Sequence, residues 1–193
     1  MKDWTNYQNE TYGDDVCKLL VEFLDNYKID NAIDLGCGSG NETVYMIKNG
    51  IKVLAIDRQL NQDFILNRLS DSEKRLISFK KSSFEDVELP KTKLLTAFFS
   101  IPFCNPNNFD ELWTKIYNSI EDNGYFVGQL FGDRDAWNVV ESINTFSIDK
   151  VKEYLKNYNI IKLEEIEYVR ESDNKKWHFY DIMAQKKVGD KHE

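Results

Sequence analysis

Three glycines at alternate positions, Gly36, Gly38 and Gly40, follow the largely apolar run 32–35. Glycine adopts backbone angles that other residues avoid, and its missing side chain lets a ligand approach the main chain closely. A strand that feeds such a loop, with a helix after it, places the loop at the carboxyl end of the strand, where ligands bind in open α/β sheets. The sequence therefore predicts a ligand-binding loop, and a tight turn without a ligand is the alternative.

An acidic residue, Asp57, ends the next predicted strand, seventeen residues beyond Gly40. A carboxylate at this point can accept the hydrogen bonds of both ribose hydroxyls. Alone, Asp57 would be interpreted as a helix cap, but beside the glycine loop it predicts a ligand that contains a ribose. Dinucleotide enzymes carry G-x-G-x-x-G with a small residue where this chain has Asn41, so a nicotinamide-dependent oxidoreductase is disfavoured.

The hydrophobic pattern predicts that strands and helices alternate, which brings these residues to one edge of a sheet. Helices are expected over residues 14–27, 42–48, 61–69, 108–120 and 147–155, with caps at Asn108 and Ser147. Strands are expected over 32–35, 52–56, 75–79, 94–99, 125–130, 160–168 and 176–184. The last two alternate in polarity around a turn at 172–174, so they predict a closing antiparallel pair.

Two motifs resemble those of a known family. Residues 34–40, Asp-Leu-Gly-Cys-Gly-Ser-Gly, are similar to the first motif of class I S-adenosylmethionine-dependent methyltransferases, and residues 53–57, Val-Leu-Ala-Ile-Asp, to the second. The resemblance extends over roughly residues 15–186, and segments 100–106 and 128–137 loosely resemble a bacterial small-molecule-type subgroup related to the tellurite-resistance methyltransferases.

The resemblance implies an α/β fold of the Rossmann-like, doubly wound type. Its mostly parallel seven-stranded sheet would carry an antiparallel C-terminal strand. We expect one methyltransferase domain over residues 1–193, in which an N-terminal arm and helix (1–28) precede the core (30–186) and a frayed tail (187–193) follows it.

The resemblance also implies that the cofactor is S-adenosyl-L-methionine. The backbone of residues 36–38 would pass beneath it, Asp34 would hold its amino-acid end, Asp57 its ribose, and Arg58 would lie beside its adenine. In and after the first two strands, the resemblance therefore implies these cofactor-binding residues: Asp34, Gly36, Cys37, Gly38, Gly40, Asp57 and Arg58.

Further assignments follow the third and fourth strands. Many relatives bind the adenine amino group with an aspartate after the third strand; here Ser83 or Phe84 would replace it. Phe99 and Ser100, at the end of the fourth strand, would lie beside the transferable methyl group.

Candidates for a catalytic role are His178, Arg134 and Tyr7. Methyl transfer is an in-line displacement, so alignment supplies most of the acceleration and a base is needed only for a protonated acceptor. His178 suits a base but is more often a partnered structural residue in a strand. Arg134 and Asp135 would bind a substrate carboxylate or pair with each other, and Trp137 is expected to pack. Among the N-terminal rings, those of Trp4, Tyr7 and Tyr12 would cover the site or pack on the domain.

Composition bears on the acceptor. With 33 acidic and 25 basic residues, the formal net charge is −8, which disfavours nucleic acid and anionic membranes as partners. Segment 100–103, Ser-Ile-Pro-Phe, stands where enzymes that methylate nucleic-acid amino groups carry Asp/Asn-Pro-Pro-Tyr/Phe, and this departure also disfavours nucleic acid. The function expected is methyl transfer to a small molecule; transfer to a protein side chain and cofactor binding without catalysis are the alternatives.

Three scattered cysteines, Cys17, Cys37 and Cys104, predict neither a disulfide framework nor a metal site. No signal peptide and no run of roughly 18 apolar residues is recognisable, so a cytoplasmic protein is expected. The excess of lysine over arginine suggests an AT-rich bacterial genome. The sequence leaves the oligomeric state open.

Overall fold

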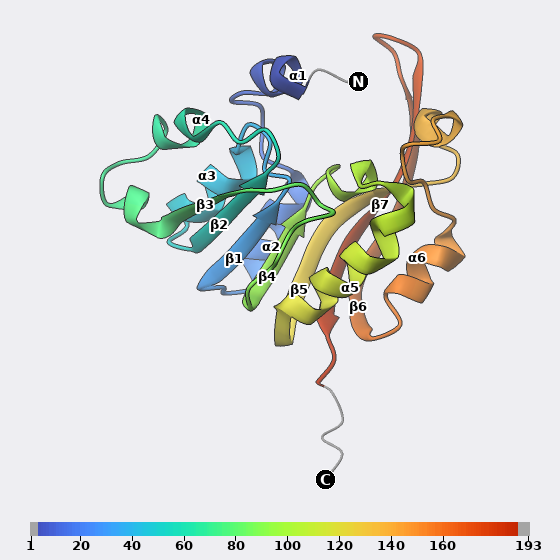
Figure 1. Cartoon of the computed structure of the whole chain (residues 1–193). Helices are drawn as coiled ribbons and strands as arrows, with labels where there is room; N and C mark the ends of the chain where they lie inside the picture. Colours follow the sequence, from blue (N-terminus) through green and yellow to red (C-terminus); the bar gives the residue numbers. More distant parts are fainter. Residues whose placement is uncertain (1–3, 189–193) are drawn as a thin grey trace.

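A computed structural model describes residues 4–188, without the side chains of Trp4, Thr5 and Tyr7. Residues 189–193 of the predicted tail lie outside the described part. The strands are β1 (Asn31–Leu35), β2 (Lys52–Asp57), β3 (Ile77–Lys81), β4 (Thr92–Ala97), β5 (Ile120–Phe131), β6 (Tyr158–Arg170) and β7 (Lys175–Lys186). They form one seven-stranded sheet in the order β3-β2-β1-β4-β5-β7-β6 (Figure 1). The predicted fold class is confirmed.

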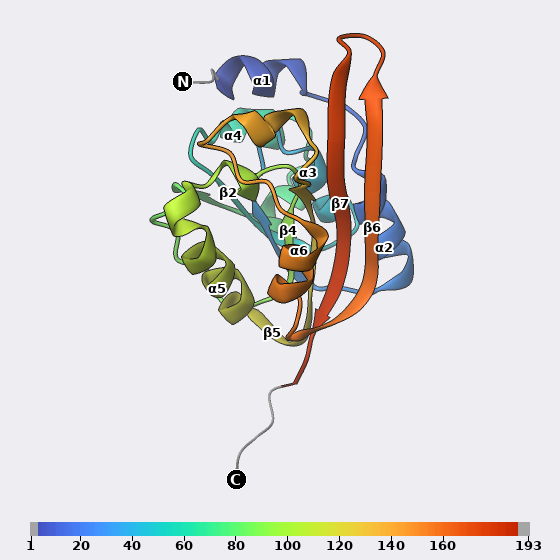
Figure 2. The ribbon, with the colours of Figure 1, turned by 90° about the vertical axis from the view of Figure 1, so that its right-hand side faces the viewer.

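Only β7 runs against the other strands of this sheet. It pairs antiparallel with β5 and with β6, whereas β1 to β5 pair in parallel. The β6–β7 hairpin is the predicted closing pair, and it projects beyond the rest of the sheet (Figure 2).

Helices cover both faces of the sheet. They are α1 (Trp4–Glu10), α2 (Lys18–Asn26), α3 (Asn41–Lys48), α4 (Gln62–Leu66), α5 (Phe109–Ser119) and α6 (Ile148–Tyr154). Successive strand residues point to opposite faces, so Ile33 packs in the core cluster beneath α5 and α6, while Ala32 packs in the one beneath α2 and α3. Figure 2 shows α5 and α2 on opposite sides of the strands. This is the doubly wound arrangement.

Two helix starts differ from the prediction. Residues 14–17 are not helical, because the chain there is held to α3: the Cys17 N–H donates to Glu42 Oε1 over 3.1 Å, and the helix begins only at Lys18. The side chain of Asn108 makes no capping hydrogen bond, because the short 3-10 helix η3 (Pro106–Asn108) leads directly into α5. Ser147 does cap α6, since its hydroxyl accepts from the Lys150 N–H.

Two predicted strands also shift. A 3-10 turn, η1 (Glu73–Leu76), takes the first residues of the predicted 75–79 strand, so β3 begins at Ile77. The 94–99 strand ends early at Ala97, because Phe99 has a left-handed backbone with φ of 45°. Left-handed geometry cannot continue a β-ladder, so the chain turns away from the sheet at this residue.

Candidate functional site

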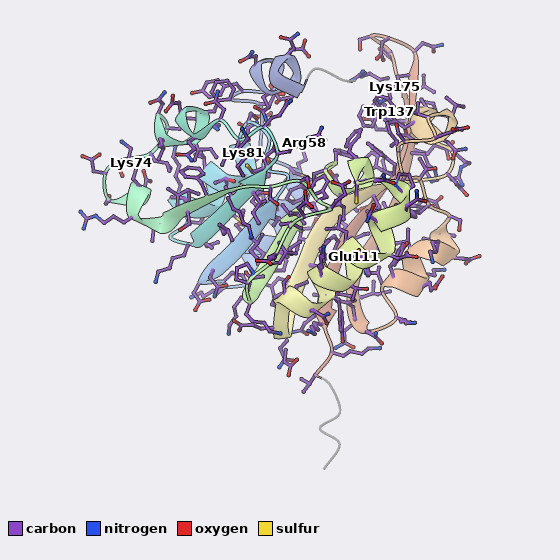
Figure 3. The ribbon with its side chains drawn as sticks, viewed as in Figure 1. Arg58, Lys74, Lys81, Glu111, Trp137 and Lys175 are labelled. Carbon is purple, nitrogen blue, oxygen red and sulfur yellow. The ribbon has the colours of Figure 1, made fainter. Side chains whose placement is uncertain are left out.

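A cleft opens at the carboxyl ends of β1, β2 and β4. Its empty volume is about 780 Å³ including the open mouth, and its walls include Gly36, Gly38, Asp57 and Arg58. In Figure 3 Arg58 lies at this edge of the sheet, with Trp137 and Lys175 on the far side of the opening. The glycine loop and the acid that ends the second strand are therefore brought together.

The three loop glycines all have positive φ, but they are required for different reasons. A Cβ on Gly36 would come within 2.3 Å of Ser100 Cβ, and one on Gly40 within 2.3 Å of Ile65 Cγ1. A Cβ on Gly38 would meet nothing within 4 Å. Packing inside the protein thus explains Gly36 and Gly40, whereas the space beside Gly38 is open cleft.

Asp57 joins the second motif to the first. Its Oδ2 accepts a hydrogen bond from the Gly38 N–H over 3.0 Å, and its Oδ1 accepts one from the Gln59 N–H over 2.8 Å. A carboxylate has about four acceptor positions. Because Asp57 lines the cleft, it retains acceptor capacity for the hydroxyl groups of a ligand.

Asp34 does not line the cleft. It is only 3% exposed and lies beneath the loop, where the hydroxyls of Thr43 and Thr96 donate to its two oxygens. Burial, reinforced by the nearby Glu42, raises the pKa of Asp34 to about 7. Its carboxylate therefore does not reach the cleft wall, where the predicted contact with the amino-acid end of a cofactor would be made. Asp34 instead supports the loop from below.

Cys37 and Gly40 are also absent from the cleft wall. Burial raises the pKa of the Cys37 thiol well above its usual value, so this side chain stays a neutral packing group. The other eight predicted cofactor residues line the cleft, and their binding role stays a prediction: Gly36, Gly38, Asp57, Arg58, Ser83, Phe84, Phe99 and Ser100.

The segment after β3 forms one wall. The Ser83 hydroxyl donates to Asp86 Oδ2 over 2.8 Å, whereas the Phe84 ring lies against Gly36, 3.2 Å from the position of a Cβ there. Of the two predicted replacements for the adenine-binding aspartate, Phe84 therefore brings an aromatic ring to the cleft wall beside the glycine loop, and the hydroxyl of Ser83 is already hydrogen-bonded. Glu85 lines the same wall.

An aromatic cluster continues the cleft beyond β4. The Phe99 ring stacks on Phe131 at a centroid distance of 5.4 Å and meets the edges of Trp177 and Phe179 at 5.5 and 5.0 Å. The neighbouring Ser100 hydroxyl donates to the Leu35 carbonyl over 2.6 Å, which fixes the turn after β4 against β1. An apolar, ring-lined surface thus adjoins the glycine loop.

A cation lies on the outer part of this cluster. Lys175 Nζ is 3.9 Å from the centroid of the Trp177 ring and 4.4 Å from that of Trp137 (Figure 3). Trp137 also packs on Phe103, which lines the cleft, so its predicted packing role agrees with its position. Such ammonium–indole contacts are favourable by about 0.5–2 kcal/mol.

His178 lies outside the cleft and is fully buried. Its Nδ1 accepts from the Arg134 N–H over 2.9 Å, which leaves Nε2 to donate to Glu165 Oε1 over 2.8 Å. Both ring nitrogens are thus used within the protein. The structure does not support His178 as a base and favours the structural alternative.

Arg134 does not line the cleft either, and it does not pair with Asp135. Its guanidinium donates to Glu167 and Glu165, and these hydrogen bonds raise its pKa. The buried Asp135 instead accepts from the N–H groups of Trp137 and His178. Arg134 therefore does not form the expected pair with Asp135. Its guanidinium is already hydrogen-bonded to two carboxylates of β6, so it links the end of β5 to β6 and is not free to bind a substrate carboxylate.

The N-terminal arm contributes a residue that sequence reasoning missed. Gln8 is buried and lines the cleft, and its Nε2 donates to the Gln59 carbonyl over 3.1 Å. The side chain of Tyr7 lies outside the described part, as does that of Trp4. Tyr12 packs on Phe64 with a centroid distance of 4.9 Å. No motif marks Gln8, whereas Gln59 and Glu85, also on the wall, directly adjoin predicted residues.

No group of three or more His, Cys, Asp or Glu side chains in residues 4–188 is placed to hold a metal ion. Across the same range, no helix is long and apolar enough to cross a membrane.

The fold agrees with solved methyltransferases. TehB from Haemophilus influenzae superposes with a TM-score of 0.79 at 20% identity, over 95% of this chain and 67% of that one. The 1,6-didemethyltoxoflavin-N1-methyltransferase of Burkholderia thailandensis, solved with bound S-adenosylhomocysteine, gives 0.70 at 13% identity, over 96% and 87% of the two chains. The strand order and the glycine loop thus define a protein of the class I methyltransferase fold.

Residues 5–177 match the model of the family described as tellurite resistance protein TehB, and the chain belongs to this family. A carboxy-S-adenosyl-L-methionine synthase of Helicobacter pylori is 27% identical over 146 residues, which are 70% of this chain and 59% of that protein. The chain spans about half to three fifths of the length of the curated relatives that it matches. The resemblance stated from the two motifs is therefore confirmed.

Proposed function

We propose that this protein is an S-adenosylmethionine-dependent methyltransferase that acts on a small-molecule acceptor. The observation that carries the proposal is the pairing of Gly38 with Asp57 beside open space. An open position at a left-handed glycine, next to a carboxylate with unused acceptor positions, fits a ribose-containing ligand.

The cleft residues fit the proposed cofactor. Asp57 would accept from the ribose hydroxyls, and Arg58 and Phe84 would flank the adenine from the ends of β2 and β3. The backbone of the loop would lie beneath the sugar and the amino-acid part. When bound, S-adenosylmethionine supplies a methyl group carried by a positively charged sulfur.

The aromatic cluster fits the acceptor side. Ring faces stabilise positive charge and exclude water, and Phe99 brings such a face to the cleft from the end of β4. Its neighbours Phe131 and Phe179 are buried, so they hold the ring in place. The chain would then accelerate transfer chiefly by aligning donor and acceptor.

Both ring nitrogens of His178 are hydrogen-bonded within the protein, and the Arg134 guanidinium is held by Glu165 and Glu167. The side chain of the third candidate, Tyr7, lies outside the described part. Glu85 is one of the titratable groups on the cleft wall. Burial acts to raise the pKa of its carboxyl group, but the Asn105 N–H that donates to it helps to lower the pKa overall. A carboxylate with a lowered pKa is a weak base. We infer that the acceptor atom arrives with a lone pair available, since a stronger base is needed only for a protonated acceptor.

Several observations support a small acceptor. The cleft is lined by the aromatic residues Phe84, Phe98, Phe99 and Phe103, and the chain carries a formal net charge of −8. The similar enzyme of Burkholderia thailandensis is named for a small-molecule substrate. A protein side chain as acceptor, and cofactor binding without transfer, remain the alternatives that experiment must separate.

Calorimetric titration tests the cofactor. S-Adenosylmethionine and S-adenosylhomocysteine should each bind with one site per chain, while a nicotinamide dinucleotide should not bind. Absence of binding by both sulfur ligands would overturn the proposal. Binding of the dinucleotide alone would indicate the oxidoreductase.

Mass spectrometry of the bound cofactor then tests the chemistry. Conversion of S-adenosylmethionine to S-adenosylhomocysteine, in the presence of a panel of small amines, thiols and oxyanions, supports methyl transfer. A parallel reaction is supplied with a panel of carboxylic acids that can act as carboxyl donors. Appearance of carboxy-S-adenosylmethionine there would instead indicate the activity named for the curated relatives. If the protein binds the cofactor tightly but forms neither product, either with the small-molecule panel or with an added protein fraction, the non-catalytic alternative is favoured.

A further inference from the structure

Arg68 lies next to the glycine loop but not on the cleft wall. Its guanidinium donates to the Ser39 carbonyl and, over 2.6 Å, to Asn41 Oδ1, while its Nε donates to the Phe64 carbonyl. One side chain thus fixes the last part of the loop and the first residue of α3 to the end of α4.

The missing side chain of Gly40 makes this approach possible. A Cβ on Gly40 would lie 2.3 Å from Ile65 Cγ1 and 3.3 Å from an Arg68 guanidinium nitrogen. Gly40 therefore leaves room for α4 and Arg68, and not for a ligand.

The residues that Arg68 holds also hold the N-terminal arm. Asn41 Nδ2 donates to the Thr11 carbonyl over 2.8 Å, and Asn41 Oδ1 accepts from the Gly13 N–H as well as from Arg68. The Tyr12 ring lies over the guanidinium, with its centroid 4.8 Å from Cζ. Arg68 is thus a shared partner of the arm and the loop.

The arm reaches the cleft. Gln8, four residues before Tyr12, lines the cleft wall and donates to the Gln59 carbonyl, two residues beyond Asp57. Figure 1 shows α1 above the edge of the sheet where β1 and β2 end. The position of the arm and the shape of the loop therefore depend on the same group.

We propose that Arg68 is a positioning residue that couples docking of the N-terminal arm (residues 8–13) to the conformation of the glycine loop, and hence to cofactor affinity. A guanidinium suits this position because its planar fork serves several acceptors at once, whereas a lysine ammonium on a flexible stem does not hold that geometry. The effect on affinity depends on the proposed function; the coupling of arm and loop does not.

Hydrogen exchange tests the coupling without any ligand. Arg68→Met keeps the apolar stem and removes every donor, so peptides covering residues 8–16 and 36–41 should both exchange faster than in wild type. Arg68→Lys should give an intermediate result. Arg75→Met, which changes an exposed arginine on η1, should exchange as wild type does.

Titration with S-adenosylhomocysteine tests the consequence. Loss of charge-assisted hydrogen bonds to the loop should raise Kd about tenfold in Arg68→Met and leave it unchanged in Arg75→Met. Faster exchange in only one of the two segments would overturn the coupling. An unchanged Kd despite faster exchange of both segments would overturn its effect on cofactor affinity. If wild type itself binds no ligand, the proposed function fails while the exchange result still decides the coupling.

A milder variant guards against unfolding. Tyr12 is 42% exposed, so Tyr12→Ala removes its ring from Arg68 without a cavity in the core. It should speed exchange in the arm and raise Kd by a smaller factor. Unchanged exchange and Kd in a folded Tyr12→Ala protein would contradict the part of the coupling that runs through this ring.

Discussion

The N–H of Gly38 donates to Oδ2 of Asp57 over 3.0 Å, so a residue of the first motif and one of the second are in direct contact. The parallel pairing of β1 with β2 brings this about, because Leu35 lies opposite Ile56 and both strands end at the same edge. A ligand on Gly38 must therefore also meet the Asp57 carboxylate.

The first prediction concerns Asp57. Asp57→Asn keeps one oxygen for the Gly38 N–H but removes the charge, so the affinity for S-adenosylhomocysteine should fall by about 1–3 kcal/mol. Calorimetric titration measures this. Asp71→Asn, at a carboxylate whose side chain is 98% exposed and paired with Lys74, is the matched control and should bind as wild type does. Equal affinity in both variants would remove Asp57 from the site.

The second prediction separates two loop glycines. Alanine at left-handed φ costs about 1–2 kcal/mol, which is all that Gly38→Ala should lose in free energy of unfolding, since its Cβ enters open space. Gly40→Ala adds a clash with Ile65 and should lose about 2–5 kcal/mol. Urea denaturation measures both.

The loss of ligand affinity should run in the opposite order among the folded variants. Gly38→Ala should lose more affinity than Gly40→Ala, because only the Cβ of Gly38→Ala fills cleft space. A Gly38→Ala protein that binds S-adenosylhomocysteine as tightly as wild type would contradict this explanation of the open position.

The third prediction is a pH dependence from Asp34. Its pKa is about 7 in the folded protein, chiefly because it is buried, against 3.8 as the ordinary value. The folded state therefore binds the proton more tightly than the unfolded state does. The contribution of Asp34 to stability is complete below pH 4 and is lost as the pH rises through 7. The loss amounts to about 4 kcal/mol.

Asp34→Asn should flatten this part of the profile. Free energies of unfolding measured in urea at pH 4.5, 6 and 8 should fall less steeply for the variant than for wild type. The Asp71→Asn control should follow the wild-type slope. Parallel profiles for wild type and Asp34→Asn would show that Asp34 does not titrate in this range.

The fourth prediction concerns His178. Because its ring is buried and bonded at both nitrogens, His178→Ala leaves the Arg134 N–H without its acceptor and opens a cavity, so the free energy of unfolding should fall by about 2–4 kcal/mol. The affinity for S-adenosylhomocysteine should stay that of wild type. A stable variant that binds the cofactor but has lost turnover would restore His178 as a catalytic candidate.

Local sequence patterns were sufficient to predict most of the fold. Buried strands such as β4 are centred on short apolar runs, and Ser147 is followed by an amphipathic helix, so the positions of these elements are set by nearby residues. The element ends were harder to predict. The start of α2 depends on Glu42, which is distant in sequence from Cys17, and the end of β4 depends on the left-handed backbone of Phe99, which no residue type announces.

The residues of the site also differ in how far the sequence predicts them. Gly38 and Asp57 each lie in a short motif with a physical purpose, so the sequence indicates them. Arg68 and Gln8 act through contacts with Ser39 and Gln59, residues far from them in the chain, and neither stands in a periodic or repeated pattern. His178 was ambiguous, because its environment depends on Arg134 and Glu165 from two other segments.

The position of β7 between β5 and β6 bears on how the protein is made. Every backbone segment around the Gly38–Asp57 pair is complete once β4 has been synthesised, whereas Trp177 and Phe179 join Phe99 only after β7 has been translated and inserted beside β5. During synthesis from the N-terminus, the half of the cleft around Gly38 and Asp57, where we propose that the cofactor binds, can therefore assemble first. The aromatic wall, which we propose faces the acceptor, must wait for a strand that arrives late and pairs across a long stretch of chain, a slow type of contact.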